Sequence, residues 1–207
     1  MNTSIRAISL TLRELITAHL RADINLRAFF DPSHGGTMVV SLLAPEELVS
    51  KNEGVSLWLY RIERDGETLN YPAQRSAANR LVPPPLPLRL HYLMVPVVDV
   101  AQRQDGPELE QHIVGAVMQV LHDHSRIRGV DFRGDLAGSP DEMHVRLESL
   151  DLDQMSRMWE ALEHSFQLCI SYEVSVVPID SSLQPIVMAA VDSAMPTYGI
   201  ITTPEDP

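Results

Sequence analysis

The chain has 207 residues, of which 44% are hydrophobic and 21% charged, which suits one globular domain with a sizeable core. Its formal net charge of −12 argues against a protein that binds nucleic acid or an anionic membrane. Cys169 is the only cysteine, which excludes an internal disulfide and a cluster of thiolate metal ligands. The first residues carry neither a signal-peptide pattern nor a membrane-spanning apolar run, so we expect a soluble protein folded in the cytoplasm.

The first twenty residues place apolar side chains at steps of three and four. This spacing predicts an amphipathic helix, and Thr3 or Ser4 can cap its start. Apolar residues then alternate over positions 24–28, which predicts a short strand, and residues 38–43 form either a second strand or a loop that packs elsewhere.

Three later segments, Val55–Ile62, Leu86–Met94 and Leu168–Val176, place an apolar residue at every second position and predict strands. Both faces of the first segment are largely apolar, so we expect it to be a central strand that is covered on each side. The prolines at 83–85 fix an extended approach to the second strand. We expect the third strand to end before Pro178.

Two further helices have clear start signals. Asp105 can cap a helix whose first turn contains Pro107, and Asp151 with Gln154 forms a capping box for the other helix. Residues 145–147 predict a short strand between the two. Some neighbouring strands are joined without a helix. The expected fold is therefore α+β, with a single mixed, mainly antiparallel sheet flanked by about three helices.

The composition changes near residue 180. We expect residues 1–180 to form the α+β domain and residues 181–207 to form a carboxy-terminal arm. The arm is too short for a domain and too apolar for a solvated tail, so it either folds back over its own core or docks on a neighbour. The residues expected at a partner interface are Ile186, Val187, Met188, Val191 and Tyr198.

The strongest metal-site candidate is the triplet His122-Asp123-His124, which His112 or His144 could complete. Residues two apart point to different sides of a helix, however, so the histidines converge only if the helix has ended. Histidines near a helix carboxyl end are also favourable by themselves, through the helix dipole and the last carbonyls. The structural interpretation is therefore favoured over a metal site.

Other catalytic patterns are weaker. Asp31–Gly36 contains glycines but lacks the Lys-Ser/Thr of a phosphate-binding loop, so it predicts a turn. Ser33 and Ser139 lack both a positioned base and a glycine-flanked elbow. Trp58 and Trp159 are expected in the core. We therefore expect no catalytic residue, no metal, no cofactor and no enzymatic activity.

The predicted elements together resemble a known family. Residues 55–63, Val-Ser-Leu-Trp-Leu-Tyr-Arg-Ile-Glu, look like the first signature of the cap, or tail-terminator, family of extracellular contractile injection systems. Its phage-tail-like particles include the antifeeding-prophage and virulence-cassette types. Residues 83–93 resemble the second signature, residues 115–124 resemble a family helix, and residues 147–180 resemble the last strand, helix and strand.

These segments occur in the family's order and cover most of Ile5–Asp180, whereas residues 23–53 and 181–207 correspond only loosely. The resemblance implies a structural cap that forms a hexameric ring and ends polymerisation of the inner tube and the contractile sheath. It implies as partners further copies of the chain together with sheath and tube proteins, in a particle that assembles in the cytoplasm and can be released.

Two alternatives from other classes of protein stay open. One is a small metal-dependent hydrolase or oxygenase that uses His122, His124 and His144. The other is an adaptor that binds one protein partner as a monomer.

Overall fold

The computed structural model describes residues 3–68, 72, 74–77, 80–99 and 103–188. The chain divides into two compact units. The larger unit comprises Met1–Asn70 and Pro85–Asp180, and the smaller unit comprises Tyr71–Pro84 and Ser181–Pro207.

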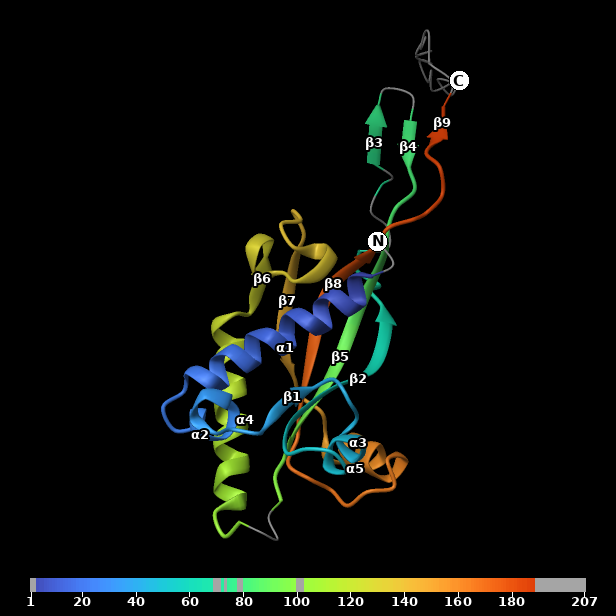
Figure 1. Cartoon of the computed structure of the whole chain (residues 1–207). Coiled ribbons are helices and arrows are strands. Elements are labelled where there is room, and N and C mark those ends of the chain that lie inside the picture. The colour runs from blue at the N-terminus through green and yellow to red at the C-terminus, as the bar shows by residue number, and fades with distance from the viewer. Residues whose placement is uncertain (1–2, 69–71, 73, 78–79, 100–102, 189–207) are drawn as a thin grey trace, which may run out of the picture. The chain divides into compact units, whose positions relative to one another are not determined.

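The larger unit is built on a six-stranded sheet with the strand order β1-β2-β5-β8-β7-β6 (Figure 1). Only the β1–β2 pair is parallel, so the sheet is mixed and mainly antiparallel, as predicted. Its strands are β1 (Val39–Ser41), β2 (Gly54–Arg64), β5 (Leu86–Val97), β6 (Arg126–Arg128), β7 (Glu142–Glu148) and β8 (Ile170–Ile179).

Helices follow the predicted periodicity. Three are long enough to flank the sheet: α1 (Ser4–Ala22), α4 (Gly106–Asp123) and α5 (Leu152–Ala161). The predicted capping box at the start of α5 is confirmed, since Asp151 accepts from the Gln154 backbone and the Gln154 side chain accepts from the Asp151 backbone. The shorter elements are α2 (Arg27–Phe30), α3 (Pro45–Val49) and the 3₁₀ turns Pro32–His34, Gly129–Asp131 and Gly134–Leu136.

The strand predicted over residues 24–28 is wrong, because this segment forms a turn that leads into α2. The Asp23 carboxylate accepts hydrogen bonds from the backbone N–H groups of Asn25 and Leu26, and these bonds wind the chain locally. Leu26 is buried, whereas Ile24 is exposed. The alternation of apolar residues therefore did not reflect a pleated strand.

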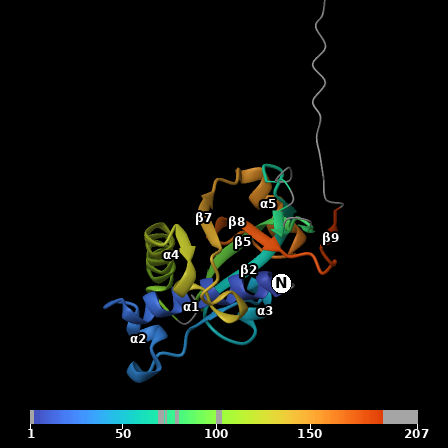
Figure 2. The ribbon, with the colours of Figure 1, turned by 90° about the horizontal axis from the view of Figure 1, so that it is seen from above.

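The two faces of the sheet are covered differently. On one face, α1 and α4 enclose the main hydrophobic core together with inward-facing residues of β2 and β5, such as Val55, Leu90 and Tyr92. The Tyr92 hydroxyl is buried and lies 2.8 Å from the Ser9 hydroxyl of α1. On the opposite face, α5 covers a smaller cluster that includes Leu93 and Trp159 (Figure 2).

The second cluster covers only part of its face of the sheet. Trp159 is buried, as predicted, whereas Trp58 is half-buried at the edge of this cluster. The part of β2 from Arg61 to Arg64 is exposed, so the prediction of a strand covered on both sides holds only for its first half.

The third predicted strand does not end before Pro178, because β8 continues to Ile179 with Pro178 opposite Pro87 of β5. The carbonyl of Pro87 accepts from Asp65 on the β2 side. The backbone carbonyl of Pro87 therefore points toward β2 and not toward β8. Pairing of β5 with β8 needs no amide N–H from Pro87 or Pro178, so this pair of positions tolerates proline.

The smaller unit contains a three-stranded antiparallel sheet with the order β3-β4-β9. It consists of β3 (Gln74–Ala77), β4 (Arg80–Val82) and β9 (Ile186–Val187), and the sequence patterns had predicted none of these three strands. Arg80 pairs with Val187 and Leu81 with Ile186, so segments about a hundred residues apart along the sequence form one sheet.

We expect substitution of Gly54 to destabilise the sheet strongly. Its φ is +141°, and a Cβ there would overlap the Val39 carbonyl across the β1–β2 pair. We expect Gly54→Ala to lower the free energy of unfolding by roughly 2 kcal/mol or more in urea denaturation. Gly115, which is exposed within α4 and has open space around it, is the control. Gly115→Ala should raise stability by about 0.5–1 kcal/mol, and equal effects of the two changes would contradict this account.

Candidate functional site

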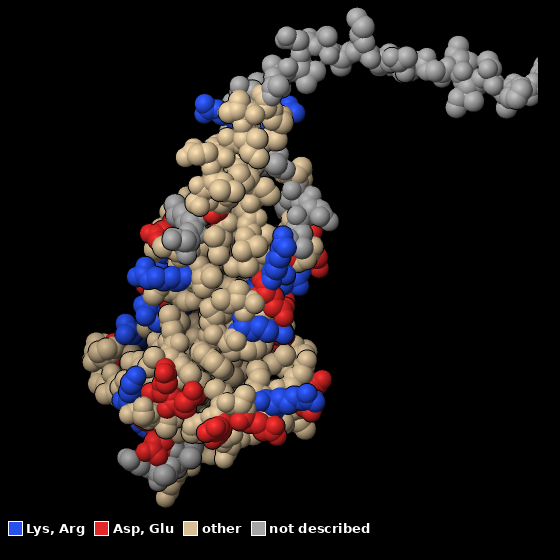
Figure 3. Space-filling model, turned by 90° about the vertical axis from the view of Figure 1, so that its right-hand side faces the viewer, with Lys and Arg blue, Asp and Glu red and all other residues tan. Residues whose placement is uncertain are grey.

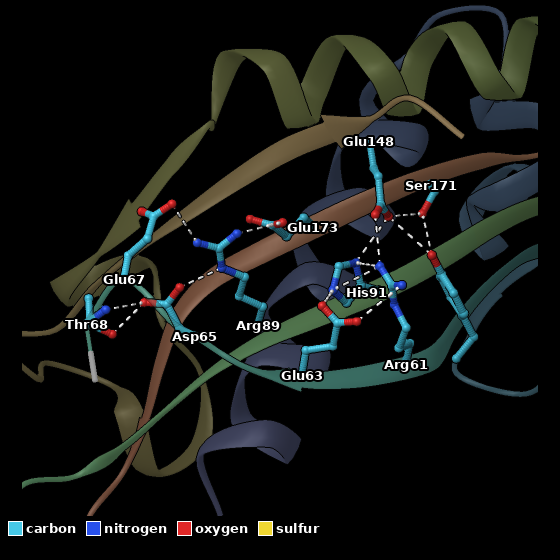
Figure 4. A network of polar contacts seen from close by, with 11 residues as sticks. Arg61, Glu63, Asp65, Glu67, Thr68, Arg89, His91, Glu148, Ser171 and Glu173 are labelled. Atoms are coloured by element: carbon cyan, nitrogen blue, oxygen red, sulfur yellow. Dashed lines mark hydrogen bonds and ion pairs between the residues drawn. The ribbon is translucent and has the colours of Figure 1, made fainter. Parts of the chain in front are cut away.

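A network of polar side chains, in two halves, lies on the face of the sheet that α5 covers only in part (Figure 4). Side chains alternate along β5, so Arg89 and His91 share this face with Leu93, whereas Leu90 and Tyr92 point into the main core. The network comprises Tyr60, Arg61, Glu63, Asp65, Glu67, Thr68, Arg89, His91, Glu148, Ser171 and Glu173.

His91 is the buried centre of one half of the network, with 2% of its side chain exposed. Its Nδ1 lies 3.1 Å from Oε2 of Glu148 on β7, and its Nε2 lies 3.5 Å from Oε2 of Glu63 on β2. Arg61 Nη2 lies 3.1 Å from Oε1 of the same Glu148. The imidazole thus lies between carboxylates from two strands that do not pair with each other.

Glu148 receives further hydrogen bonds at Oε2. The Ser171 hydroxyl donates at 2.7 Å and the Tyr60 hydroxyl at 3.2 Å. Burial by itself raises the pKa of the Glu148 carboxyl, but the hydrogen bonds from Ser171, His91 and Tyr60 outweigh it and hold the pKa below its ordinary value. The carboxylate is therefore the charged acceptor on which this half of the network is built.

This arrangement does not activate a nucleophile. In a catalytic triad the serine hydroxyl bonds to the imidazole, which in turn bonds to the acid. Here Ser171 and His91 both contact the Glu148 carboxylate. Ser171 is also buried, so its hydroxyl is not presented to a substrate. The geometry suits cross-linking of strands.

The other half of the network is centred on Arg89. Its Nε lies 2.6 Å from Oδ1 of Asp65, which is only 1% exposed, and its other nitrogens reach Glu67 at 3.2 Å and Glu173 at 3.6 Å. Thr68 donates its hydroxyl and its backbone N–H to Asp65. The Thr68 hydroxyl, together with the Arg89 guanidinium, lowers the pKa of the Asp65 carboxyl. One guanidinium thus joins the end of β2 and the turn after it to β5 and β8.

The sequence patterns did not predict this network. Its signal was present in β5, where Arg89 and His91 alternate with three apolar residues. The same alternation brings Glu173 of β8 opposite His91. Alternation predicted the strands, but the partner of each polar residue depends on strand register.

The histidines proposed for a metal site do not converge. His122 lines a groove beside α4 and β7, whereas His124 lines another groove beside α1 and has its Nδ1 2.9 Å from the Val120 carbonyl oxygen. His144 Nε2 lies 3.6 Å from Glu142, and His112 Nε2 lies 4.0 Å from Asp23. Within the part of the chain that the structure describes, no three His, Cys, Asp or Glu residues are grouped to hold a metal ion.

The predicted arm residues lie partly in the smaller unit. Ile186 and Val187 form β9 and are 61% and 66% exposed, and Met188, which follows them, is half-buried. Val191 and Tyr198 lie outside the described residues. The structure thus places two adjacent apolar side chains on a strand with most of their surface in solvent.

Charge is distributed without a large patch of one sign on the face drawn in Figure 3, where basic and acidic side chains are interspersed. Broad areas of uncharged surface separate them. Of the helices described, none is both long and apolar enough to cross a membrane.

Comparison with known proteins gives a consistent result. The model of the Pvc16 N-terminal domain family matches residues 7–191. The structure is similar to the PVC sheath/tube terminator of an extracellular contractile injection system in its extended state, with 20% identity and a TM-score of 0.55 over 95% of this chain and 63% of that one. It is also similar to the anti-feeding prophage cap, a tube-terminating cap, with 17% identity and a TM-score of 0.58 over 96% of this chain and 61% of that one.

At these identities the two structures establish the fold, which is the α+β fold expected from the sequence. The chain spans just over three fifths of the length of each. No curated protein matches it.

The lowered pKa of Glu148 predicts a pH dependence of stability. A carboxylate whose folded pKa is depressed stabilises the fold above its unfolded pKa, and this contribution is lost as the pH falls through the folded pKa. We expect the free energy of unfolding to fall as the pH is lowered from about 5 toward 3, and to fall less steeply in Glu148→Gln. At pH 7 this variant should be less stable by about 1–3 kcal/mol. Both quantities are measured by urea denaturation across this pH range.

Glu67→Gln provides the matched control, because Glu67 also contacts an arginine of the network but is 84% exposed. Its stability and its pH profile should stay close to those of the unmodified protein. Identical pH profiles for Glu148→Gln and the unmodified protein would show that Glu148 does not carry the predicted dependence.

Proposed function

The chain belongs to the Pvc16 N-terminal domain family, and we propose that it is a structural cap that ends polymerisation of the tube and sheath in a contractile injection system. The observation that carries this proposal is the fold shared with two terminators over nearly the whole chain. The polar network adds support, because its hydrogen bonds join strands and leave its serine and histidine without a catalytic relation.

A cap works by burying surfaces that a growing polymer leaves unsatisfied. The end of a tube presents a ring of free edges and apolar contacts, and a ring of matching symmetry can cover them without offering the same surface again. We propose that the chain forms such a ring as a homo-hexamer. If each subunit buries an ordinary interface of about 800 Å² per partner, many modest contacts close the end through avidity.

The polar network suits this role mechanically. A cap must hold its contact surfaces in fixed relative positions while its neighbours in the particle change state. Arg89 and His91 connect β2, β5, β7 and β8 across a face that no long helix covers completely. Such a cross-linked sheet provides the rigid platform that a ring of precisely fitted subunits needs.

We also propose different roles for two parts of the chain. Residues 1–180 form the domain that builds the ring, and residues 181–207 form an arm that docks on a neighbouring subunit or on the sheath. The exposure of Ile186 and Val187 supports this role, because adjacent apolar side chains on a strand favour contact with a partner. We propose that Met188, Val191 and Tyr198 of the arm belong to the same interface. The capped particle assembles in the cytoplasm and is then released from the cell.

Removal of the chain from an assembling particle tests the proposal. Sheath and tube proteins co-expressed with the chain should give particles of narrow length distribution with density closing one end, as seen by electron microscopy. Without the chain, the tubes should be longer and more variable in length, because nothing stops subunit addition. Indistinguishable length distributions and bare ends in both preparations would refute a capping role.

Charge placed on the arm should prevent docking. We expect Ile186→Asp combined with Val187→Asp to reduce co-sedimentation of the chain with sheath and tube at least about tenfold, because burying an unpaired carboxylate costs several kcal/mol. Leu183→Asp is the control, since Leu183 is 72% exposed in the same unit but precedes β9. Equal co-sedimentation of both variants and the unmodified protein would remove the arm from the proposed interface.

A further inference from the structure

A groove runs between α1 and the β1 edge of the six-stranded sheet, and no residue of the polar network lines it. Its volume is about 460 Å³. It lies entirely within the larger unit. The lining residues that matter here are Arg13, Thr17 and Arg21 of α1, Val39 and Val40 of β1, and Arg133.

The backbone of β1 is available along this groove. β1 is the outermost strand of its sheet and pairs only with β2 among the strands that the structure describes. The Val39 N–H donates to the Glu53 carbonyl on the β2 side, and backbone groups of successive residues alternate in direction along a strand. The N–H and C=O of Val40 therefore point away from β2. On this outer side the Met38 N–H already donates to the Phe29 carbonyl. The backbone N–H and C=O of Val40 are therefore the groups of β1 that could bond to an added strand.

The groove is positively charged in a protein whose net charge is −12. Arg13 makes no ion pair with any described residue, and Arg21 donates only to the Phe30 carbonyl, at 3.2 Å. Arg133 pairs with Glu14, the one carboxylate in the described lining, at 2.9 Å. Three guanidinium groups thus face one carboxylate, and the uncompensated charge favours an acidic occupant.

The chain itself contains a segment of that chemistry. Residues 198–206 read Tyr-Gly-Ile-Ile-Thr-Thr-Pro-Glu-Asp, with β-branched residues that favour an extended strand and two carboxylates near the end. The described part of the chain stops at Met188. Nine residues, the number from 189 to 197, can span at most about 30 Å when fully extended.

We propose that Tyr198–Asp206 of a second copy lies along β1 in this groove as an added strand, with Glu205 and Asp206 facing Arg13 and Arg21. The added strand bonds to the outward backbone of Val40, and its side chains line the groove between α1 and β1. This inference rests on the proposed ring, because a segment passed from each subunit to the next is a head-to-tail contact that closes by rotation.

Charge reversal in the groove tests the contact. In Arg13→Glu, native mass spectrometry and sedimentation of the whole chain, alone and with sheath and tube ends, should show self-association at least about tenfold weaker. Combining it with Glu205→Arg and Asp206→Arg should restore association, because the opposite charges again face each other. Arg6→Glu is the control, since Arg6 is an exposed arginine of the same helix that lies outside the groove.

Hydrogen exchange provides an independent readout. The Val40 amide should become protected when the ring forms and should lose this protection in Arg13→Glu.

If rings form equally well in Arg13→Glu and the Val40 amide stays unprotected, the inference is overturned while the proposed function stands. If Arg13→Glu forms rings that no longer cap tubes, the groove takes a strand from sheath or tube, which overturns the second copy as its occupant. If the unmodified chain caps tubes without self-association, the proposed ring and the proposed groove contact are both rejected, whereas the proposed capping role stands.

Discussion

The register of β5 between β2 and β8 is the constraint on which the rest of the larger unit depends. Alternation along this strand sends Leu90 and Tyr92 into the core under α1 and α4, and sends Arg89 and His91 to the opposite face. A shift by one residue would bury two charged or polar groups under α1 and expose two apolar ones. The register is therefore strongly specified by burial on one face and by ion pairs on the other.

The two faces are stabilised by different interactions, and this difference has a functional consequence. The α1–α4 face is held by apolar burial, which does not depend on pH, whereas the opposite face is held in part by carboxylates with lowered pKa values. The second face leaves a polar sheet surface beside the small cluster around Trp159. In the proposed ring, this part of the sheet surface, which no further helix covers, leaves space for neighbouring subunits.

The two edges of the six-stranded sheet differ in how readily they could pair with another chain. At one edge, β6 is only three residues long and carries exposed Arg126 and Arg128, which discourages pairing with other chains. At the other edge, β1 is equally short but borders a basic groove. An edge that accepts only a strand with suitable charge is selective, and selectivity of this kind suits a protein that should add to a particle once.

The sequence by itself determined the strands β2, β5, β7 and β8, the long helices, the α5 capping box and the family resemblance, because periodicity and capping are local and survive without knowledge of the fold. Only the tertiary structure decided the features that depend on contacts between segments far apart in the sequence. The strand predicted over residues 24–28 failed because Asp23 made a local turn, and β8 passed Pro178 because Pro87 faced it. The network around His91, and the sheet that joins β4 to β9, follow from register and from contacts between distant segments, which no local pattern encodes.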